Sequence, residues 1–154
     1  MSPHSHAHSH SHAPVTVQDN GRRAVAASHA LARLTTRKKN TVLEAMAAEL
    51  ETRQSAIIAA NQEDVDAARA AGTTGAMLDR LTLTPSRFAA MVKGVRDVVA
   101  LKDPVGEIIS TWMRPNGLEI RKIRVPIGVI GFIYEARPNV TTDAVALCIK
   151  SSNA

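Results

Sequence analysis

Apolar side chains recur at helical spacing between residues 21 and 101. Val25, Leu31 and Leu34 form a first stripe, and a second stripe has the form of one face of an amphipathic helix. Its members are Val42, Leu43, Met46, Ala47 and Leu50. Thr41 and Glu44 have the spacing of a capping box, so the pattern predicts that this helix begins at residue 41.

Start and stop signals predict two further helical segments. Asn61 is a candidate cap for a turn that runs to Ala71, and Gly72 is placed to end it. Thr84 followed by Pro85 is typical of a helix start, because proline at the first helical position has no amide hydrogen to leave unpaired. The apolar residues of this helix are Phe88, Met91, Val92, Val95 and Val99, and Lys102-Asp103-Pro104 ends it.

After Pro104 the period of the apolar side chains changes from 3.6 residues to two, as in β-strands. Residues 108–113 and 118–125 are rich in strand-forming side chains, and Pro115-Asn116-Gly117 lies between them. We therefore predict a hairpin in which Asn-Gly supplies the positive φ angles of a tight turn. The apolar parity shifts between Ile120 and Ile123, which requires either a bulge or a second buried face.

Residues 128–134 are apolar on both parities, as in a parallel strand that is covered on both faces. Thr141-Thr142-Asp143 is a candidate cap for a following helix, so the end of the chain predicts a strand, loop and helix unit. One such strand needs neighbours to satisfy its backbone and to cover its faces. We therefore expect the sequence to be the N-terminal part of a longer protein.

The first residues differ in composition from the rest. Residues 1–20 carry His4, His6, His8, His10 and His12 in alternation with Ser and Ala, without apolar periodicity. Such a segment is expected to be disordered, and it can chelate metal ions adventitiously, although its spacing matches no closed structural site. The pattern thus divides the chain into a tail (1–20), a helical part (21–103), a hairpin (104–126) and a strand-helix unit (127–154).

Composition and charge exclude several classes of protein. The 154 residues carry 19 Lys+Arg against 14 Asp+Glu, but the basic residues are scattered, and aromatic residues make up only 3% of the chain. The one short run of basic residues, at 37–39, is typical of a solvated helix boundary, so no nucleic-acid partner is expected. No apolar run is long enough to span a bilayer, no secretory signal is evident, and Cys148 is the single cysteine. We expect a cytoplasmic protein without a membrane partner.

The loop between the predicted strand and helix carries the candidate chemistry. Glu135, Arg137 and Asn139 follow the carboxyl end of the strand, where α/β proteins bind ligands and where helix amides favour anions. Spacing alone equally allows Arg137 to pair with Glu135 while the loop only shapes a turn. Gly128 and Gly131 do not form a dinucleotide fingerprint. Cys148 lies in an apolar stretch without a basic neighbour, which favours a buried structural thiol over a nucleophile.

Several stretches resemble the glutamate-5-semialdehyde dehydrogenase (gamma-glutamyl phosphate reductase) family. They include Met77-Leu-Asp-Arg-Leu-Thr-Leu83, Leu101-Lys-Asp-Pro-Val-Gly106 and, most specifically, Tyr134-Glu-Ala-Arg-Pro-Asn-Val140. The resemblance covers residue 22 to the end. It implies an α/β, aldehyde dehydrogenase-like fold, here only the N-terminal helices and first strand-helix unit of the nucleotide-binding domain and a hairpin oligomerisation arm.

The resemblance also implies an activity, the reduction of L-glutamyl 5-phosphate by NADPH to L-glutamate 5-semialdehyde in proline biosynthesis. The family's nucleophilic cysteine lies downstream, so these 154 residues are expected to be inactive alone. Residues Ile133, Tyr134, Glu135 and Ala136 resemble the cofactor-passing strand end, Asn139 the oxyanion-hole asparagine, and a small shift in alignment puts Arg137 there instead. We assign Arg137 to the substrate's anionic groups.

The implied partners are further copies of the full-length chain in a homo-oligomer and glutamate 5-kinase. No metal is implied. An alternative from another class is a small helical module that binds metal through its His-rich tail or nucleic acid through its basic helices.

Overall fold

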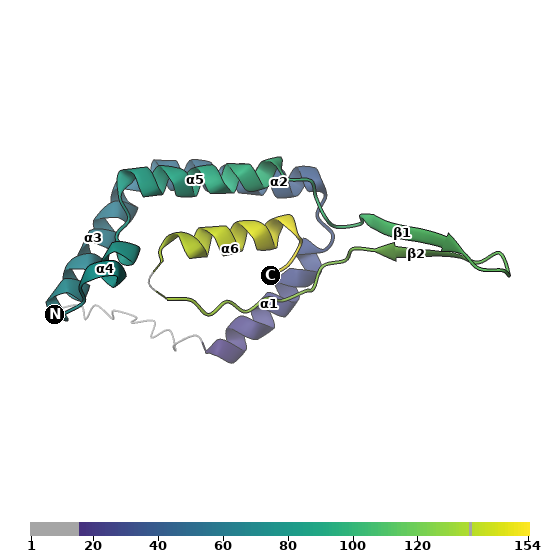
Figure 1. Cartoon of the computed structure of the whole chain (residues 1–154), viewed down its shortest axis with the longest axis horizontal. Coiled ribbons are helices and arrows are strands. Elements are labelled where there is room, and N and C mark those ends of the chain that lie inside the picture. The colour runs from purple at the N-terminus through teal and green to yellow at the C-terminus, as the bar shows by residue number, and fades with distance from the viewer. Residues whose placement is uncertain (1–15, 136) are drawn as a thin grey trace, which may run out of the picture.

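The computed structural model describes residues 16–135 and 137–154. The predicted tail up to residue 15 and the candidate residue Ala136 lie outside these ranges. Within them, the elements are α1 (Val17–Leu31), α2 (Thr36–Thr52), α3 (Gln54–Ala70), α4 (Gly75–Leu81), α5 (Pro85–Ala100), β1 (Ile108–Met113), β2 (Glu119–Ile123) and α6 (Asn139–Lys150). Helices α2, α5 and α6 pack together, and the β1–β2 hairpin projects from one end of the helical body (Figure 1).

The core lies between α2, α5 and α6 and uses the predicted apolar stripes. Leu43 and Ala47 of α2 and Val95 of α5 are fully buried, and they pack in one cluster with Phe88 and with Ala146 of α6. Complete burial of a side chain of this kind contributes roughly 2 kcal/mol. The helical periodicity of the sequence therefore identified the faces that hold α2 and α5 together.

Helix α1 begins inside the segment predicted to be a disordered tail. Thr16 and Asp19 form a capping box, in which the Asp19 amide donates to Thr16 Oγ1 (3.1 Å) and the Thr16 amide to Asp19 Oδ2 (3.2 Å). The predicted boundary at residue 20 is therefore wrong, because this cap starts the helix at Val17. The apolar stripe of α1 is poorly buried, with Val25 half exposed.

The predicted start of α2 at Thr41 is also wrong. Thr35 caps the helix by accepting a hydrogen bond from the Lys38 amide, so α2 begins one and a half turns earlier, at Thr36. The Thr41 hydroxyl instead donates to the Arg37 carbonyl inside the helix (3.0 Å). A threonine hydroxyl can cap a helix or donate to a carbonyl one turn earlier. Because Thr35 already caps α2, Thr41 lies inside the helix and makes the second kind of bond.

Asn61 does not cap a helix. It lies in the middle of α3, is 8% exposed, and its side chain binds the link between α4 and α5. Its Nδ2 donates to the Leu81 carbonyl (2.9 Å), and its Oδ1 accepts from the Leu83 amide (2.7 Å). The predicted stop at Gly72 is confirmed, since α3 ends before it and Gly72 has a φ of +86°.

Helix α5 begins as predicted. Thr84 is the N-cap and accepts a hydrogen bond from the Arg87 amide (3.2 Å), and Pro85 is the first helical residue. Phe88, Met91 and Val92 are buried, as their spacing indicated. A start signal made of two specific residues was thus sufficient to place this helix.

The hairpin is confirmed, with a different turn. Ile108 pairs with Ile123 and Ser110 with Lys122, so a bulge lies at Ile109 on the first strand and not between Ile120 and Ile123 on the second strand, where the shift in apolar parity placed it. Among the described residues of the turn only Gly117 has a positive φ (+83°), and its amide donates to the Arg114 carbonyl (2.9 Å). Pro115 holds φ near −65°, which favours a three-residue loop closed by a glycine over the predicted two-residue turn.

Residues 128–134 are not a covered strand. They have no regular secondary structure, and Phe132, Ile133 and Tyr134 are about half exposed or more. The Ala154 amide donates to the Gly128 carbonyl (2.9 Å), and the Ile130 amide donates to the Ala154 carbonyl (2.7 Å). This is the bond pattern of a parallel pair, but it involves a single residue of the neighbouring segment.

Two buried lysines join α2, α6 and the base of the hairpin. Lys39, 1% exposed, pairs with Asp103 Oδ2 (2.5 Å) and donates to Ser152 Oγ (3.0 Å). Lys150, 3% exposed, donates to Asn40 Oδ1 (2.8 Å) and to the Val99 carbonyl (2.9 Å). The prediction that residues 37–39 are a solvated boundary is therefore wrong for Lys39, since a paired ammonium can be buried.

Candidate functional site

Helix α6 begins directly at the candidate loop. Pro138 has helical backbone angles (φ −58°, ψ −35°), and Asn139 is the first residue of the helix. The predicted cap at residues 141–143 is wrong because Pro138 already directs the chain into a helix ahead of them. No side chain caps this end, so the first amides of α6 lack a side-chain acceptor within the described part of the chain.

Arg137 and Asn139, two of the three polar residues predicted for the loop, lie at this helix start. Asn139 Nδ2 donates to Asp143 Oδ2 (2.9 Å), which uses one of its two amide protons. Arg137 is exposed and forms no ion pair with Glu135 among the described residues. The alternative in which these two side chains only neutralise each other is therefore not observed.

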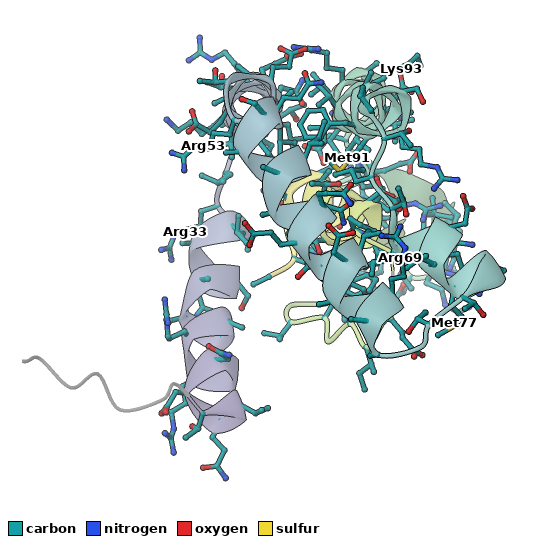
Figure 2. The ribbon with its side chains drawn as sticks, turned by 90° about the vertical axis from the view of Figure 1, so that its left-hand side faces the viewer. Arg33, Arg53, Arg69, Met77, Met91 and Lys93 are labelled. Carbon is teal, nitrogen blue, oxygen red and sulfur yellow. The ribbon has the colours of Figure 1, made fainter. Side chains whose placement is uncertain are left out.

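Arg137 and Asn139 line a hollow of about 390 Å³ where α4, α5 and the start of α6 meet. We call it the arginine hollow. Its charged lining residues are Asp79, Arg80, Arg87, Arg137 and Asp143. Met91, at its base, belongs to the buried side of α5 and lies among the packed side chains in Figure 2.

Arg87 is neutralised inside this hollow. Its Nη2 donates to both carboxylate oxygens of Asp79, each at 2.9 Å, and its Nη1 donates to the Thr82 carbonyl (3.0 Å). Both bonds to the carboxylate come from one nitrogen, so the pair is not a two-nitrogen fork, but it still joins the two charges directly. Arg87 therefore serves to hold the end of α4 against α5.

A second hollow of about 410 Å³ lies on the other side of the loop. Arg137 and Pro138 line both spaces, and the second also includes Asp64, Tyr134 and Thr141. The Tyr134 hydroxyl lies 2.5 Å from Thr141 Oγ1. This contact links the end of the extended segment to the first turn of α6 and fixes the span of the loop.

The residues predicted to pass a cofactor lie on exposed backbone. Ile133 is fully exposed, and Tyr134 and Glu135 are also exposed, while Ala136 lies outside the described residues. An apolar hollow of about 340 Å³ runs beside this segment and is lined by Phe132, Tyr134 and residues of α6. The segment therefore presents free backbone next to an apolar surface, which suits an aromatic ring.

Cys148 lines the same apolar hollow. Burial raises the pKa of its thiol, and no basic side chain among the described residues opposes that effect. A raised pKa keeps sulfur protonated and poorly nucleophilic. This agrees with the interpretation of Cys148 as a structural thiol.

Sequence reasoning missed the contribution of α4 and α5 to the site. Arg80 and Arg87 precede Arg137 by 57 and 50 residues, and Asp143 was predicted only as part of a helix cap. The available signal was the Asp79-Arg80 pair just before the Thr84-Pro85 helix start, with Arg87 immediately after it. Spacing gives no reason to place that corner against Arg137.

Two further observations concern metal binding and the membrane. Within residues 16–135 and 137–154, no three His, Cys, Asp or Glu side chains gather in a way that suits a metal ion. In the same part of the chain, the helices are too short or too polar to cross a bilayer.

Curated relatives cover nearly the whole chain. A gamma-glutamyl phosphate reductase of Moorella thermoacetica is 55% identical over 138 residues, which are 90% of this chain and 33% of that protein. One from Rhodospirillum rubrum is 54% identical over 141 residues, 92% of this chain and 33% of its own length. No family model matches. The chain thus spans about a third of the length of the curated relatives it matches.

Solved structures agree with this relationship. The crystal structure of gamma-glutamyl phosphate reductase from Thermotoga maritima superposes with a TM-score of 0.85 at 42% identity, over 89% of this chain and 33% of that one. The enzyme of the same name from Saccharomyces cerevisiae gives a TM-score of 0.86 at 30% identity, over 91% of this chain and 36% of its own.

The helices, the projecting hairpin and the loop before α6 therefore form part of an aldehyde dehydrogenase-like α/β fold. Within that class, the chain is homologous to gamma-glutamyl phosphate reductases along nine-tenths of its length. The resemblance read from residues 134–140 is confirmed.

Proposed function

We propose that the chain forms the corresponding portion of an NADPH-dependent gamma-glutamyl phosphate reductase. The reaction reduces L-glutamyl 5-phosphate to L-glutamate 5-semialdehyde and releases phosphate, a step of proline biosynthesis in the cytoplasm. The observation that carries the proposal is the 55% identity to a reductase over 138 residues, which are 90% of this chain. The proposal extends to a homo-oligomer, joined through the hairpin, and to association with glutamate 5-kinase.

In this proposal Arg137 binds an anionic group of the substrate, and Asn139 stabilises the oxyanion that forms at the reacting carbonyl. The second proton of Asn139 Nδ2 is a donor of the kind this chemistry needs, and no side chain caps the first turn of α6, where the Val140 amide donates to the Arg137 carbonyl. A guanidinium forms two parallel hydrogen bonds to a carboxylate or phosphate. Both side chains line the arginine hollow, which supports a shared ligand.

The cofactor assignment covers residues 133–136. NADPH supplies a hydride when it is bound. Its nicotinamide ring suits the apolar hollow beside the exposed backbone of Ile133 and Tyr134. The chain's own part is to present this backbone and to keep Phe132 and the apolar face of α6 beside it.

The nucleophile is not proposed to come from these residues. The family's mechanism needs a thiolate, and Cys148, with its raised pKa, is the single cysteine of the chain. We therefore expect the 154-residue polypeptide alone to catalyse no reduction.

The test is a reductase assay of the complete gene product, followed as NADP⁺ reduction in the presence of glutamate 5-semialdehyde and phosphate. Arg137→Ala should raise the KM for the substrate and lower kcat/KM by roughly a hundredfold, since losing charge-assisted hydrogen bonds to an anionic group costs up to about 3 kcal/mol and each 1.4 kcal/mol is about a factor of ten. Arg33→Ala, at the exposed junction of α1 and α2, is the matched control and should retain activity. An inactive complete gene product, or an Arg137 variant with unchanged KM and kcat, would contradict the proposal.

A further inference from the structure

Two of the three guanidinium groups in the arginine hollow are free. Arg87 is neutralised by Asp79, but Arg80 and Arg137 make no side-chain hydrogen bond or ion pair to any residue in the described ranges. Asp143, the other acid of the hollow, accepts its hydrogen bond from Asn139. The hollow thus has three arginines against two aspartates, and its uncompensated charge is positive.

Arg80 is held in place by its neighbours. It lies in the last turn of α4, between Asp79, which is bonded to Arg87, and Leu81, whose carbonyl accepts from Asn61 Nδ2. The Leu83 amide donates to the same asparagine. These bonds tie the end of α4 to both α3 and α5, so the backbone that carries Arg80 is fixed before any ligand arrives.

Free arginines that line one hollow favour an anion. Like charges in a shared space repel each other, and an oxyanion between them relieves this repulsion. Guanidinium groups are also planar forks that match the oxygens of a carboxylate or phosphate. The uncapped first turn of α6, which borders the hollow at Asn139, adds to the positive potential.

We propose that Arg80 is a further ligand-binding residue, which with Arg137 grips a carboxylate or phosphate group in the arginine hollow. The identification of that group with part of L-glutamyl 5-phosphate rests on the proposed function. The anion site itself rests only on the charges and contacts of the hollow. It extends the site from the candidate loop to α4.

The site can be tested in the 154-residue chain by titration with inorganic phosphate and, separately, with L-glutamate, followed by the NMR amide signals of Arg80 and Asn139. Arg80→Gln should weaken binding about tenfold or more, because it removes a charge-assisted fork. Arg80→Lys keeps the positive charge but not the planar fork of the guanidinium. Its affinity for the anion should therefore lie between that of the original chain and that of Arg80→Gln. Because the Arg80 side chain is exposed and unbonded within the described structure, the melting temperature should not change.

Arg33→Gln is the matched control, since it removes the same charge from an exposed position. Figure 2 shows Arg33 on the side of the molecule opposite Met77 of α4. A response to phosphate alone assigns the site to a phosphate group, and a response to glutamate alone assigns it to a carboxylate. Binding that is absent, unchanged in Arg80→Gln, or equally weakened in Arg33→Gln overturns the proposal.

An assay of the complete gene product separates this inference from the proposed function. Arg80→Gln should raise the KM for the substrate about tenfold and alter kcat less. A complete gene product that lacks reductase activity, while its anion binding still depends on Arg80, refutes the function and retains the site. An active enzyme whose KM and anion binding ignore Arg80→Gln refutes the site and retains the function.

Discussion

Single side chains decide how the corner next to the site is built. Asn61 is a polar residue on a helix face that is otherwise packed, and its amide replaces the missing partners of the Leu81 carbonyl and the Leu83 amide. A buried backbone group without a partner is costly, so this one side chain permits the chain to turn between α4 and α5. Arg80 lies beside the turn that Asn61 stabilises.

We predict that Asn61→Ala lowers the free energy of unfolding by about 2 kcal/mol, because it leaves two backbone groups unsatisfied. Urea denaturation followed by circular dichroism measures the change. Gln62→Ala, at the exposed neighbouring position, is the control and should stay within about 0.5 kcal/mol of the original chain. Equal stability of the Asn61 variant would mean that water replaces the side chain without loss.

The elements are joined by a buried charged cluster at the end of the body that carries the hairpin. Asp103 follows α5, accepts from Lys39 of α2 and from the Thr36 hydroxyl, and lies next to Lys150 of α6. Burial by itself raises the pKa of Asp103, but the hydrogen bonds from Lys39 and Thr36 outweigh it and hold the pKa below its ordinary value. For Lys150, burial lowers the pKa, and Asp103 opposes that effect.

Asp103→Asn should cost about 3 kcal/mol at pH 7, since it leaves a buried lysine without its counter-charge. The native pKa of Asp103 is depressed, so its stabilising contribution is complete above about pH 4, the ordinary pKa of an aspartate, and is lost as the pH falls further. Urea denaturation at several pH values should therefore show the gap between the two proteins narrowing in acid. Asp97→Asn, in an exposed pair with Lys93, should change little at any pH. A gap that is constant down to pH 2 would contradict this account.

At the scale of the whole molecule, the apolar surface is unevenly covered. Leu43, Phe88 and Val95 form a closed core, whereas the segment around Phe132 and Ile133 and part of α6 are open to solvent. The hairpin strands are likewise exposed, apart from Ile120 of β2, which is half-buried. Contiguous exposed apolar surface favours association, so the 154-residue chain should bind to itself through this side.

Ile133→Ser should therefore reduce self-association of the 154-residue chain, measured by sedimentation velocity over a range of concentrations. Ile133 makes no contribution to the core, so the melting temperature should stay the same. Ser110→Ala, on the hairpin, is a control for changes at other exposed positions. A chain that is monomeric at every concentration, or an Ile133 variant that associates as before, would be evidence against the apolar segment as the contact.

Local signals predicted those parts of the fold that need only neighbouring residues. Thr84-Pro85 placed the start of α5, Gly72 the stop after α3, and the strand-forming runs around residues 115–117 the hairpin. Prediction was poorer where one residue had two local options, as with Thr41 and Asn61. The lining of the arginine hollow was half predicted, since Arg137 and Asn139 lie close together in the sequence, while Arg80 and Arg87 reach the hollow only through packing.

The sequence by itself determined the helical faces, the hairpin and the family relationship, because these depend on residue types at short spacing. Only the tertiary structure decided that Lys39 is buried against Asp103 and that residues 128–134 lie open along one side. It also decided that the corner of α4 and α5 meets the start of α6. Those outcomes depend on which distant segments supply hydrogen bonds and bury the apolar side chains. The spacing of residues along the chain does not predict these long-range contacts.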